Sequence, residues 1–301
     1  MWRVAADDRS LDDVARTLAA HHGVSVAAIA ELVPLRGGYW SSAYAYRHDG
    51  RDLVARFGSD RGSFEADRNA MSYARPGLPV PEVLDIIGDG DRWLAISVRH
   101  RGTFLEELDP EQAGPAAPSI ERMLASLRSV QGPAGVDLWH AWLLDGLVDH
   151  PSRAVNGWRA TMSDDIGALF DAAVAEVRRL VPACPERRDL VHGDLLHQNV
   201  LVDDDRVSAV FSWKCSTFGD FLYDAAWCDF WSPWHPGIEA LDVVGRTLAA
   251  PDLTASDRVA ATARLRCYLL HIGATHLAWC TWTGGDDDLR AVAARSAALL
   301  G

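Results

Sequence analysis

Hydrophobic and polar positions repeat with two different periods along this chain. Near the N-terminus, Ser10 precedes apolar residues at helical spacing, and this pattern predicts a capped amphipathic helix that ends at Gly23. Alternating apolar positions then lie on both sides of an Asp49-Gly50 pair, which is typical of a β-hairpin. A further alternating run over 91–98 predicts another strand. The first third therefore reads as a small sheet preceded by a helix.

The remainder of the chain follows the helical period. Apolar residues recur at steps of three and four between Ser163 and Pro182, and the runs 256–280 and 286–300 predict two more helices. The Pro-, Gly- and Ala-rich stretch 109–119 is expected to be a surface loop. Strands that come first and helices that follow indicate an α+β fold.

The strongest chemical signal is the segment His192–Asn199, followed by the apolar run Val200–Val202. It has the form H-x-D-x-x-x-x-N before a strand. In phosphoryl transfer of the kinase type, such an Asp accepts the proton of the attacking hydroxyl and such an Asn binds magnesium. Asp194 and Asn199 are the candidates. The alternative is an ordinary turn between two strands, because short patterns of this kind recur by chance.

The sequence after this loop carries a resemblance. A second strand is expected over 206–213 after the acidic turn 203–205, and a Gly-Asp pair then precedes Tyr223-Asp224. The span 192–226 resembles the aminoglycoside phosphotransferase family, which has a two-lobed protein-kinase-like fold. Segments in both halves resemble the hygromycin B branch of that family, in the same order: 78–86, 184–186, 230–234 and 268–273. The resemblance implies a small sheet-rich nucleotide-binding lobe over 1–99 and a larger, mainly helical catalytic and acceptor-binding lobe over 100–301.

The resemblance also implies a nucleotide site in the first lobe. Gly37-Gly38 with Ser41 and Ser42 would form the turn that covers the phosphates, since small residues let backbone N–H groups approach oxygens. Arg56 stands where the family more often has lysine, and Asp67 is its expected acidic partner, with Glu65 as the alternative. A hinge is expected at Gly102, and the pocket for the adenine base would be lined by Ser97, Val98 and Arg99, which precede it.

One position departs from the family pattern. Where the family has Ile-Asp-Trp, this chain has Phe211-Ser212-Trp213, so the metal site would consist of Asn199 and Ser212 without its second carboxylate. Lys214, the only lysine, is expected on the same strand face as Ser212. Two hypotheses stay open: a kinase that uses ATP or GTP with Mg²⁺, and a kinase-like binding protein with impaired transfer.

The acceptor pocket is expected in the segment that follows the catalytic strands. Carboxylates and aromatic rings can hold the ammonium groups of an aminoglycoside. The candidate substrate-binding residues are Gln198, Asp224, Asp229, Trp231 and Glu239. Asp224 has a structural alternative, because an Asp near a Gly-Asp turn often caps a helix. Another small amino alcohol or sugar is the alternative acceptor.

Composition and net charge limit the possible binding partners and the cellular location. The chain of 301 residues has a formal net charge of −13, which argues against nucleic-acid binding and is compatible with a cationic small substrate. No apolar stretch is long enough to predict a membrane segment or a signal peptide. The 5 cysteines show no C-x-x-C spacing, so we expect neither a disulfide framework nor a zinc site, and a cytoplasmic location follows. We expect a monomer.

Overall fold

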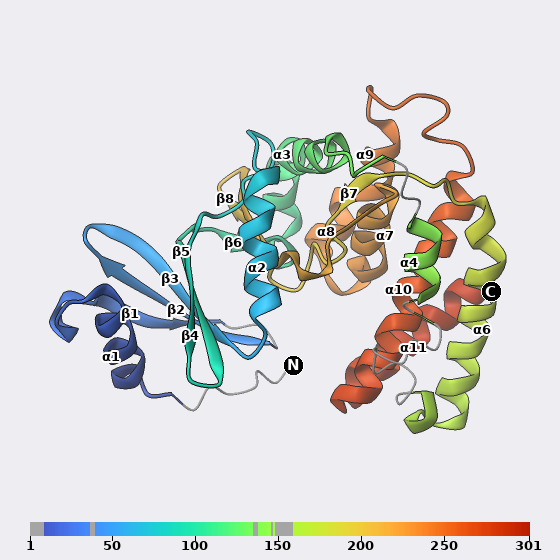
Figure 1. The fold of residues 1–301 in the computed structure, drawn as a ribbon. Helices are drawn as coiled ribbons and strands as arrows, with labels where there is room; N and C mark the ends of the chain where they lie inside the picture. The colour runs from blue at the N-terminus through green and yellow to red at the C-terminus, as the bar shows by residue number, and fades with distance from the viewer. Residues whose placement is uncertain (1–8, 37–39, 135–137, 146, 148–158) are drawn as a thin grey trace. The chain divides into compact units, whose positions relative to one another are not determined.

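The computed structural model describes residues 9–36, 40–134, 138–145, 147 and 159–301, and the chain folds into two compact units (Figure 1). The first unit comprises Met1–Leu105 and His197–Cys215, and the second comprises Glu106–Leu196 and Ser216–Gly301. This division differs from the predicted boundary between residues 99 and 100. The reason is that the short strand β6 (Thr103–Phe104) pairs with β8 (Val200–Asp203), so the hairpin after the catalytic motif folds with the N-terminal sheet.

The first unit contains the predicted sheet. Its five antiparallel strands have the order β1-β2-β3-β5-β4. They are β1 (Ala30–Leu35), β2 (Ser41–His48), β3 (Arg51–Gly58), β4 (Val83–Asp89) and β5 (Arg92–Val98). The turn between β2 and β3 has positive φ at both Asp49 (48°) and Gly50 (72°), as a tight two-residue hairpin requires.

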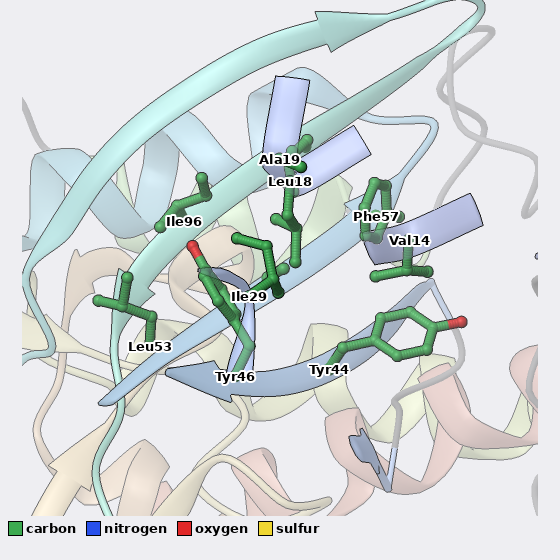
Figure 2. Packing of buried hydrophobic residues seen from close by; sticks show 11 residues of the cluster. Val14, Leu18, Ala19, Ile29, Tyr44, Tyr46, Leu53, Phe57 and Ile96 are labelled. Atoms are coloured by element: carbon green, nitrogen blue, oxygen red, sulfur yellow. The ribbon is translucent and has the colours of Figure 1, made fainter. Parts of the chain in front are cut away.

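The two faces of this sheet carry different helices. Helix α1 (Leu11–His22) is capped by Ser10 and ends at Gly23. Its Val14 and Leu18 belong to one buried apolar cluster with Leu53 and Phe57 of β3 (Figure 2), and Ala55 of β3 is part of the same cluster. Because side chains alternate along a strand, Arg56 points to the opposite face. Helix α2 (Arg61–Ala70) contacts β4 and β5, and its buried side chains are Phe64, Asp67 and Ala70.

The hairpin of β8 and β9 (Arg206–Val210) completes the first unit. The predicted strand over 206–213 was wrong in its last part. Ser212 has a left-handed backbone (φ 67°), and Trp213–Cys215 forms a single 3₁₀ turn, so the extended chain stops at Val210. The expectation that Lys214 shares a strand face with Ser212 was therefore also wrong. Lys214 instead forms an ion pair with Asp60, the N-cap of α2.

The second unit is mainly helical, with one two-stranded sheet of β7 (Asp189–Val191) and β10 (Thr217–Gly219). Its helices are α3 (Pro110–Ser129), α4 (Trp139–Asp145), α6 (Asp164–Leu180), α7 (Leu222–Trp231), α8 (Pro236–Leu241), α9 (Val243–Ala249), α10 (Ala261–Thr283) and α11 (Asp286–Leu300). Helix α10 packs against α6, α7 and α11. Among the described residues, no helix is long and apolar enough to cross a bilayer. The 5 cysteines all lie in the described part, and none forms a disulfide.

Helix α3 corrects the predicted loop over 109–119. Asp109 caps the helix by accepting from the N–H groups of Glu111 and Gln112, and Pro110 occupies its first position, where proline is favourable. Pro115 and Pro118 lie inside the helix, where each proline costs about 3 kcal/mol. The face that contains Ala113, Ala116, Ala117 and Ile120 is buried. Tertiary packing of this face outweighs the local penalty.

Candidate active site

Asp224, in the first turn of α7, binds the backbone of the loop that begins at His192. The backbone N–H groups of His192 and Gly193 donate to the two carboxylate oxygens of Asp224, each at 2.9 Å. Asp224 is only 2% exposed, and burial raises its pKa, whereas His192 and the two backbone donors act in the opposite direction. The structural alternative was wrong in its form, because Asp224 lies inside α7, whose N-cap is Phe221, and does not cap a helix. A substrate contact of Asp224 stays a prediction. Asp224 orients the backbone that carries Asp194.

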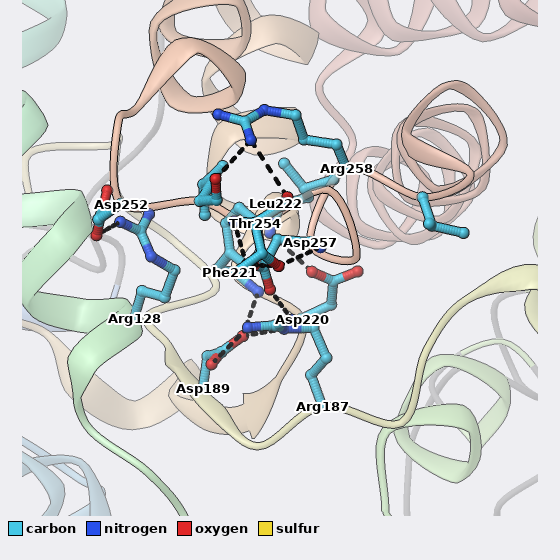
Figure 3. A network of polar contacts seen from close by, with 12 residues as sticks. Arg128, Arg187, Asp189, Asp220, Phe221, Leu222, Asp252, Thr254, Asp257 and Arg258 are labelled. Carbon is cyan, nitrogen blue, oxygen red and sulfur yellow. Dashed lines mark hydrogen bonds and ion pairs between the residues drawn. The ribbon is translucent and has the colours of Figure 1, made fainter.

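A second buried carboxylate fixes the turn before α7. Asp220 is 0% exposed and accepts from Arg264 Nη2 (2.6 Å), Arg264 Nε (2.7 Å) and the Tyr268 hydroxyl (2.6 Å). The next residue, Phe221, lies close to Asp189 of β7, which forms an ion pair with Arg187 (Figure 3). These contacts join the turn to the strand that leads into the catalytic motif. Arg264 was missed in the sequence, because nothing local distinguishes it from a surface arginine.

The two predicted metal positions meet at one end of the β8–β9 hairpin in the first unit. The Phe211 N–H donates to the Asn199 carbonyl oxygen at 3.0 Å, which places Ser212 beside Asn199. His197 (φ 61°), Gln198 (φ 70°) and Ser212 (φ 67°) all have left-handed backbones. Such conformations are unfavourable for residues other than glycine, and they cluster at functional sites.

The predicted contact between Arg56 and Asp67 is present on the face of the sheet that α2 covers. Asp67 uses its other oxygen to accept the Trp213 N–H at 2.8 Å. Glu65, the alternative partner, pairs with Arg61 at 2.7 Å. Asp67 thus connects the β3 arginine to the segment that contains Ser212. The binding of nucleotide by Arg56 and Asp67 stays a prediction.

The predicted base-pocket residues lie at the end of β5. The Val98 N–H donates to the Glu82 carbonyl at 2.9 Å and the Arg99 N–H to the Asp52 carbonyl at 3.0 Å. The N–H groups of Val98 and Arg99 are therefore already hydrogen-bonded to neighbouring parts of the first unit. Ser97 pairs with the two strands on either side of β5. Next to Gly102, where the sequence predicts a hinge, the Arg101 carbonyl accepts from Ser208 Oγ at 2.6 Å. Gly102 (φ 144°) follows, and an added Cβ there would lie 2.5 Å from the Val202 oxygen.

The predicted phosphate-covering residues are only partly described. Gly37 and Gly38 lie outside the described residues. Ser41 and Ser42 are the first residues of β2, opposite Gly58 and Phe57 of β3, so they belong to the strand that follows the predicted turn.

The remaining acceptor candidates are spread over both units. In the second unit, Asp229 on α7 lies 3.4 Å from Arg295, and burial raises the pKa of Asp229. Trp231 is 7% exposed and packs edge-to-face on His276, which is a core position, whereas Glu239 on α8 is exposed. Gln198 belongs to the first unit. With its amide oxygen facing Arg36, Gln198 accepts from Arg36 Nε (2.9 Å) and Nη2 (3.3 Å).

The side chains at the metal positions do not fit the magnesium ion that the resemblance implied. Magnesium in phosphate sites is usually held through one or two carboxylates. Asn199 offers an amide and Ser212 a hydroxyl, both of them neutral. The adjacent carboxylate of Asp67 is engaged through both oxygens, by Arg56 and by the Trp213 N–H.

Comparison with known proteins identifies the family of this chain. The phosphotransferase enzyme family (APH) matches residues 31–257. Hygromycin-B 4-O-kinase from Escherichia coli is 32% identical over 275 residues, which cover 86% of this chain and 77% of that protein. The crystal structure of aminoglycoside phosphotransferase APH(4)-Ia superposes with a TM-score of 0.83 at 25% identity, covering 97% of this chain and 98% of that one.

A thermostable mutant of the same enzyme, in a ternary complex with ADP and hygromycin B, gives a TM-score of 0.80 at 27% identity, over 95% of this chain and 97% of that one. A choline/ethanolamine kinase family protein from Mesorhizobium loti, 19% identical with a TM-score of 0.62 over 96% of this chain and 94% of that one, shares the fold. The two-lobed kinase-like fold is thereby confirmed, and this chain belongs to the phosphotransferase enzyme family.

Proposed function

We propose that this protein is an ATP-dependent phosphotransferase that acts on a hydroxyl of a hygromycin B-like aminoglycoside and so confers resistance in the cytoplasm. The observation that supports this proposal is the position of Asp194, which directly follows two residues whose backbone N–H groups donate to Asp224. Asp194 accepts the proton of the acceptor hydroxyl while the hydroxyl oxygen forms a bond to the γ-phosphorus. The bond from phosphorus to the bridging oxygen breaks, and ADP leaves.

The acceptor is proposed to be polycationic because the chain is acidic. The formal net charge is −13, and Asp229 and Glu239 follow the catalytic strands. If these carboxylates hold ammonium groups, the affinity for hygromycin B should weaken as salt rises to about 0.5 M, since exposed charge pairs are screened. Calorimetric titration at low and high salt measures this. A dissociation constant that does not change with salt would contradict the electrostatic part of the proposal.

The direct test is turnover on a panel of acceptors. The panel contains hygromycin B, other aminoglycosides, a neutral sugar and a small amino alcohol. ADP release together with a product mass increase of one phosphate on an aminoglycoside is the expected result. Phosphorylation of the sugar or amino alcohol alone would replace the proposed acceptor.

A second candidate function is favoured by Ser212. The missing carboxylate makes a kinase-like binding protein with slow or absent transfer the alternative. Saturable binding of hygromycin B and ADP, without product over the whole panel, would establish that alternative.

A further inference from the structure

We propose that the first unit binds the phosphates of a nucleoside diphosphate or triphosphate directly through Arg36 and Arg56, and that this binding needs no divalent cation. The proposal rests on the nucleotide part of the proposed function and is independent of the acceptor. The first observation is that both residues at the expected metal-ligand positions, Asn199 and Ser212, are neutral. The family's pattern has a carboxylate at the position of Ser212.

The carboxylates of the first unit near this place do not replace the metal ligand that is missing at Ser212. Asp67 is engaged by Arg56 and by the Trp213 N–H. Asp60 caps α2 through the Gly62 N–H at 2.9 Å and pairs with Lys214. Asp203, Asp204 and Asp205 belong to the turn at the opposite end of the β8–β9 hairpin, about 13 Å or more from Asn199 at about 3.3 Å per residue. Within the described residues, no group of three or more His, Cys, Asp or Glu could hold a metal ion.

Arg36 brings a positive charge to the same place. Its guanidinium donates to the side-chain oxygen of Gln198, the residue before Asn199. A guanidinium stays protonated in proteins, so Arg36 adds one formal positive charge beside Gln198. Arg36 follows β1 directly, and it therefore joins the first strand of the sheet to the end of the hairpin where Asn199 and Ser212 meet.

Arg56 supplies the second cation from β3. It contacts Asp67 through Nη2 and lies over the Phe64 ring at 5.1 Å, which orients the planar guanidinium. A guanidinium has five N–H donors in a fork that matches phosphate oxygens, and these contacts use only part of it. The side chain is 20% exposed.

The charges balance without a metal. A carboxylate and a divalent cation together present one net positive charge to the phosphates. A serine together with one arginine presents the same net charge. Removing the carboxylate also removes the repulsion that would oppose direct contact between phosphate and protein, and such repulsion is strong at short distance.

The test is calorimetric titration of ADP into the full chain, once with excess EDTA and once with excess magnesium chloride. For the parent, the dissociation constant in EDTA should be within about threefold of the value in magnesium, or tighter. In Ser212→Asp, removing magnesium should weaken ADP binding by about tenfold, or roughly 1.4 kcal/mol. Arg36→Gln should weaken ADP binding in EDTA by about tenfold and leave adenosine binding unchanged, because adenosine has no phosphates. Arg36→Lys should retain part of the affinity.

Arg206→Gln is the matched control. Arg206 lies at the far end of the same hairpin with its side chain 80% exposed, so its loss should leave ADP binding unchanged. Magnesium that tightens ADP binding by tenfold or more in the parent would overturn the proposal. Equal effects of Arg36→Gln and Arg206→Gln would overturn the role of Arg36.

ADP binding and product formation together distinguish failure of this proposal from failure of the proposed function. If the folded parent binds no ADP in either buffer, both proposals fail. If it binds ADP without metal and yields no product on the acceptor panel, only the phosphotransferase proposal fails.

Discussion

Replacement of Asp220 by asparagine should destabilise the second unit by about 3–5 kcal/mol, the usual cost of removing one member of a buried ion pair. Asp220 and Arg264 have side-chain exposures of 0% and 1%, and the carboxylate receives two guanidinium bonds and one hydroxyl bond. Asparagine keeps one acceptor oxygen, but its amide group turns a donor toward the other arginine N–H. The charge of Arg264 would then remain buried without its counter-charge.

The magnitude can be expressed as a melting temperature. For units of about 150–250 residues, 1 kcal/mol corresponds to about 2–4 °C, so Asp220→Asn should lower the melting temperature by about 6–20 °C. Tyr268→Phe removes only the hydroxyl that donates to Asp220 at 2.6 Å and accepts from Trp139 Nε1 at 3.1 Å. Its expected cost is smaller, about 1–3 kcal/mol, for the unsatisfied buried groups.

Thermal and urea unfolding followed by circular dichroism measure these effects. The matched control is Asp171→Asn, which removes a pair with Arg159 in which the Arg159 and Asp171 side chains are 41% and 59% exposed. Exposed pairs contribute at most about 1 kcal/mol, so this variant should unfold almost like the parent. If Asp220→Asn and Asp171→Asn lose the same stability, the reasoning about the buried network is refuted.

Three further changes test other parts of the molecule. Asp194→Asn should lower any aminoglycoside phosphorylation by about 10² while hygromycin B still binds, and unchanged turnover would remove Asp194 as the base. Gly102→Ala should destabilise the first unit by about 1–3 kcal/mol in urea unfolding, because its Cβ would lie 2.5 Å from the Val202 oxygen, and a neutral effect would contradict this close approach. Burial and the neighbouring His48 and His21 lower the pKa of His22 from 6.5, so the folded state binds fewer protons than the unfolded one below about pH 6.5. Stability of the first unit should be fully present above that pH and fall as the pH drops toward the lowered pKa, and in His22→Gln this decline, measured by urea unfolding between about pH 7.5 and 5.5, should be smaller.

The parts of the fold that the sequence predicted are those where local pattern and tertiary packing agree. Ser10 and Gly23 bound α1 because a hydroxyl cap and a left-handed glycine act within a few residues. Asp49-Gly50 predicts its hairpin for the same reason. The pair of Arg56 and Asp67 was predicted through the family resemblance, since no local pattern connects a strand residue to a residue on the next helix.

The parts that were mispredicted depend on contacts between distant residues. Helix α3 contains two internal prolines, and only the burial of its alanine-rich face explains why it is a helix. The end of β9 is set by Asp67, which lies far away in the sequence and binds the Trp213 N–H. Asp224 is recognisable as a support of the loop only when the His192 and Gly193 N–H groups are seen to point at it.

The left-handed backbone at Ser212 connects these observations. Asp and Asn tolerate this conformation better than most residues, and a non-glycine residue held there costs about 1–3 kcal/mol. Here a serine occupies it, next to the Trp213 N–H that Asp67 accepts and beside Asn199. The backbone therefore has a conformation that suits a carboxylate residue, while the side chain has lost the charge. The departure from the family pattern is thus a change of electrostatics at one position of an intact hairpin, so the chain retains the kinase-like fold, and the metal-independent binding of phosphate that we propose requires no change of the backbone.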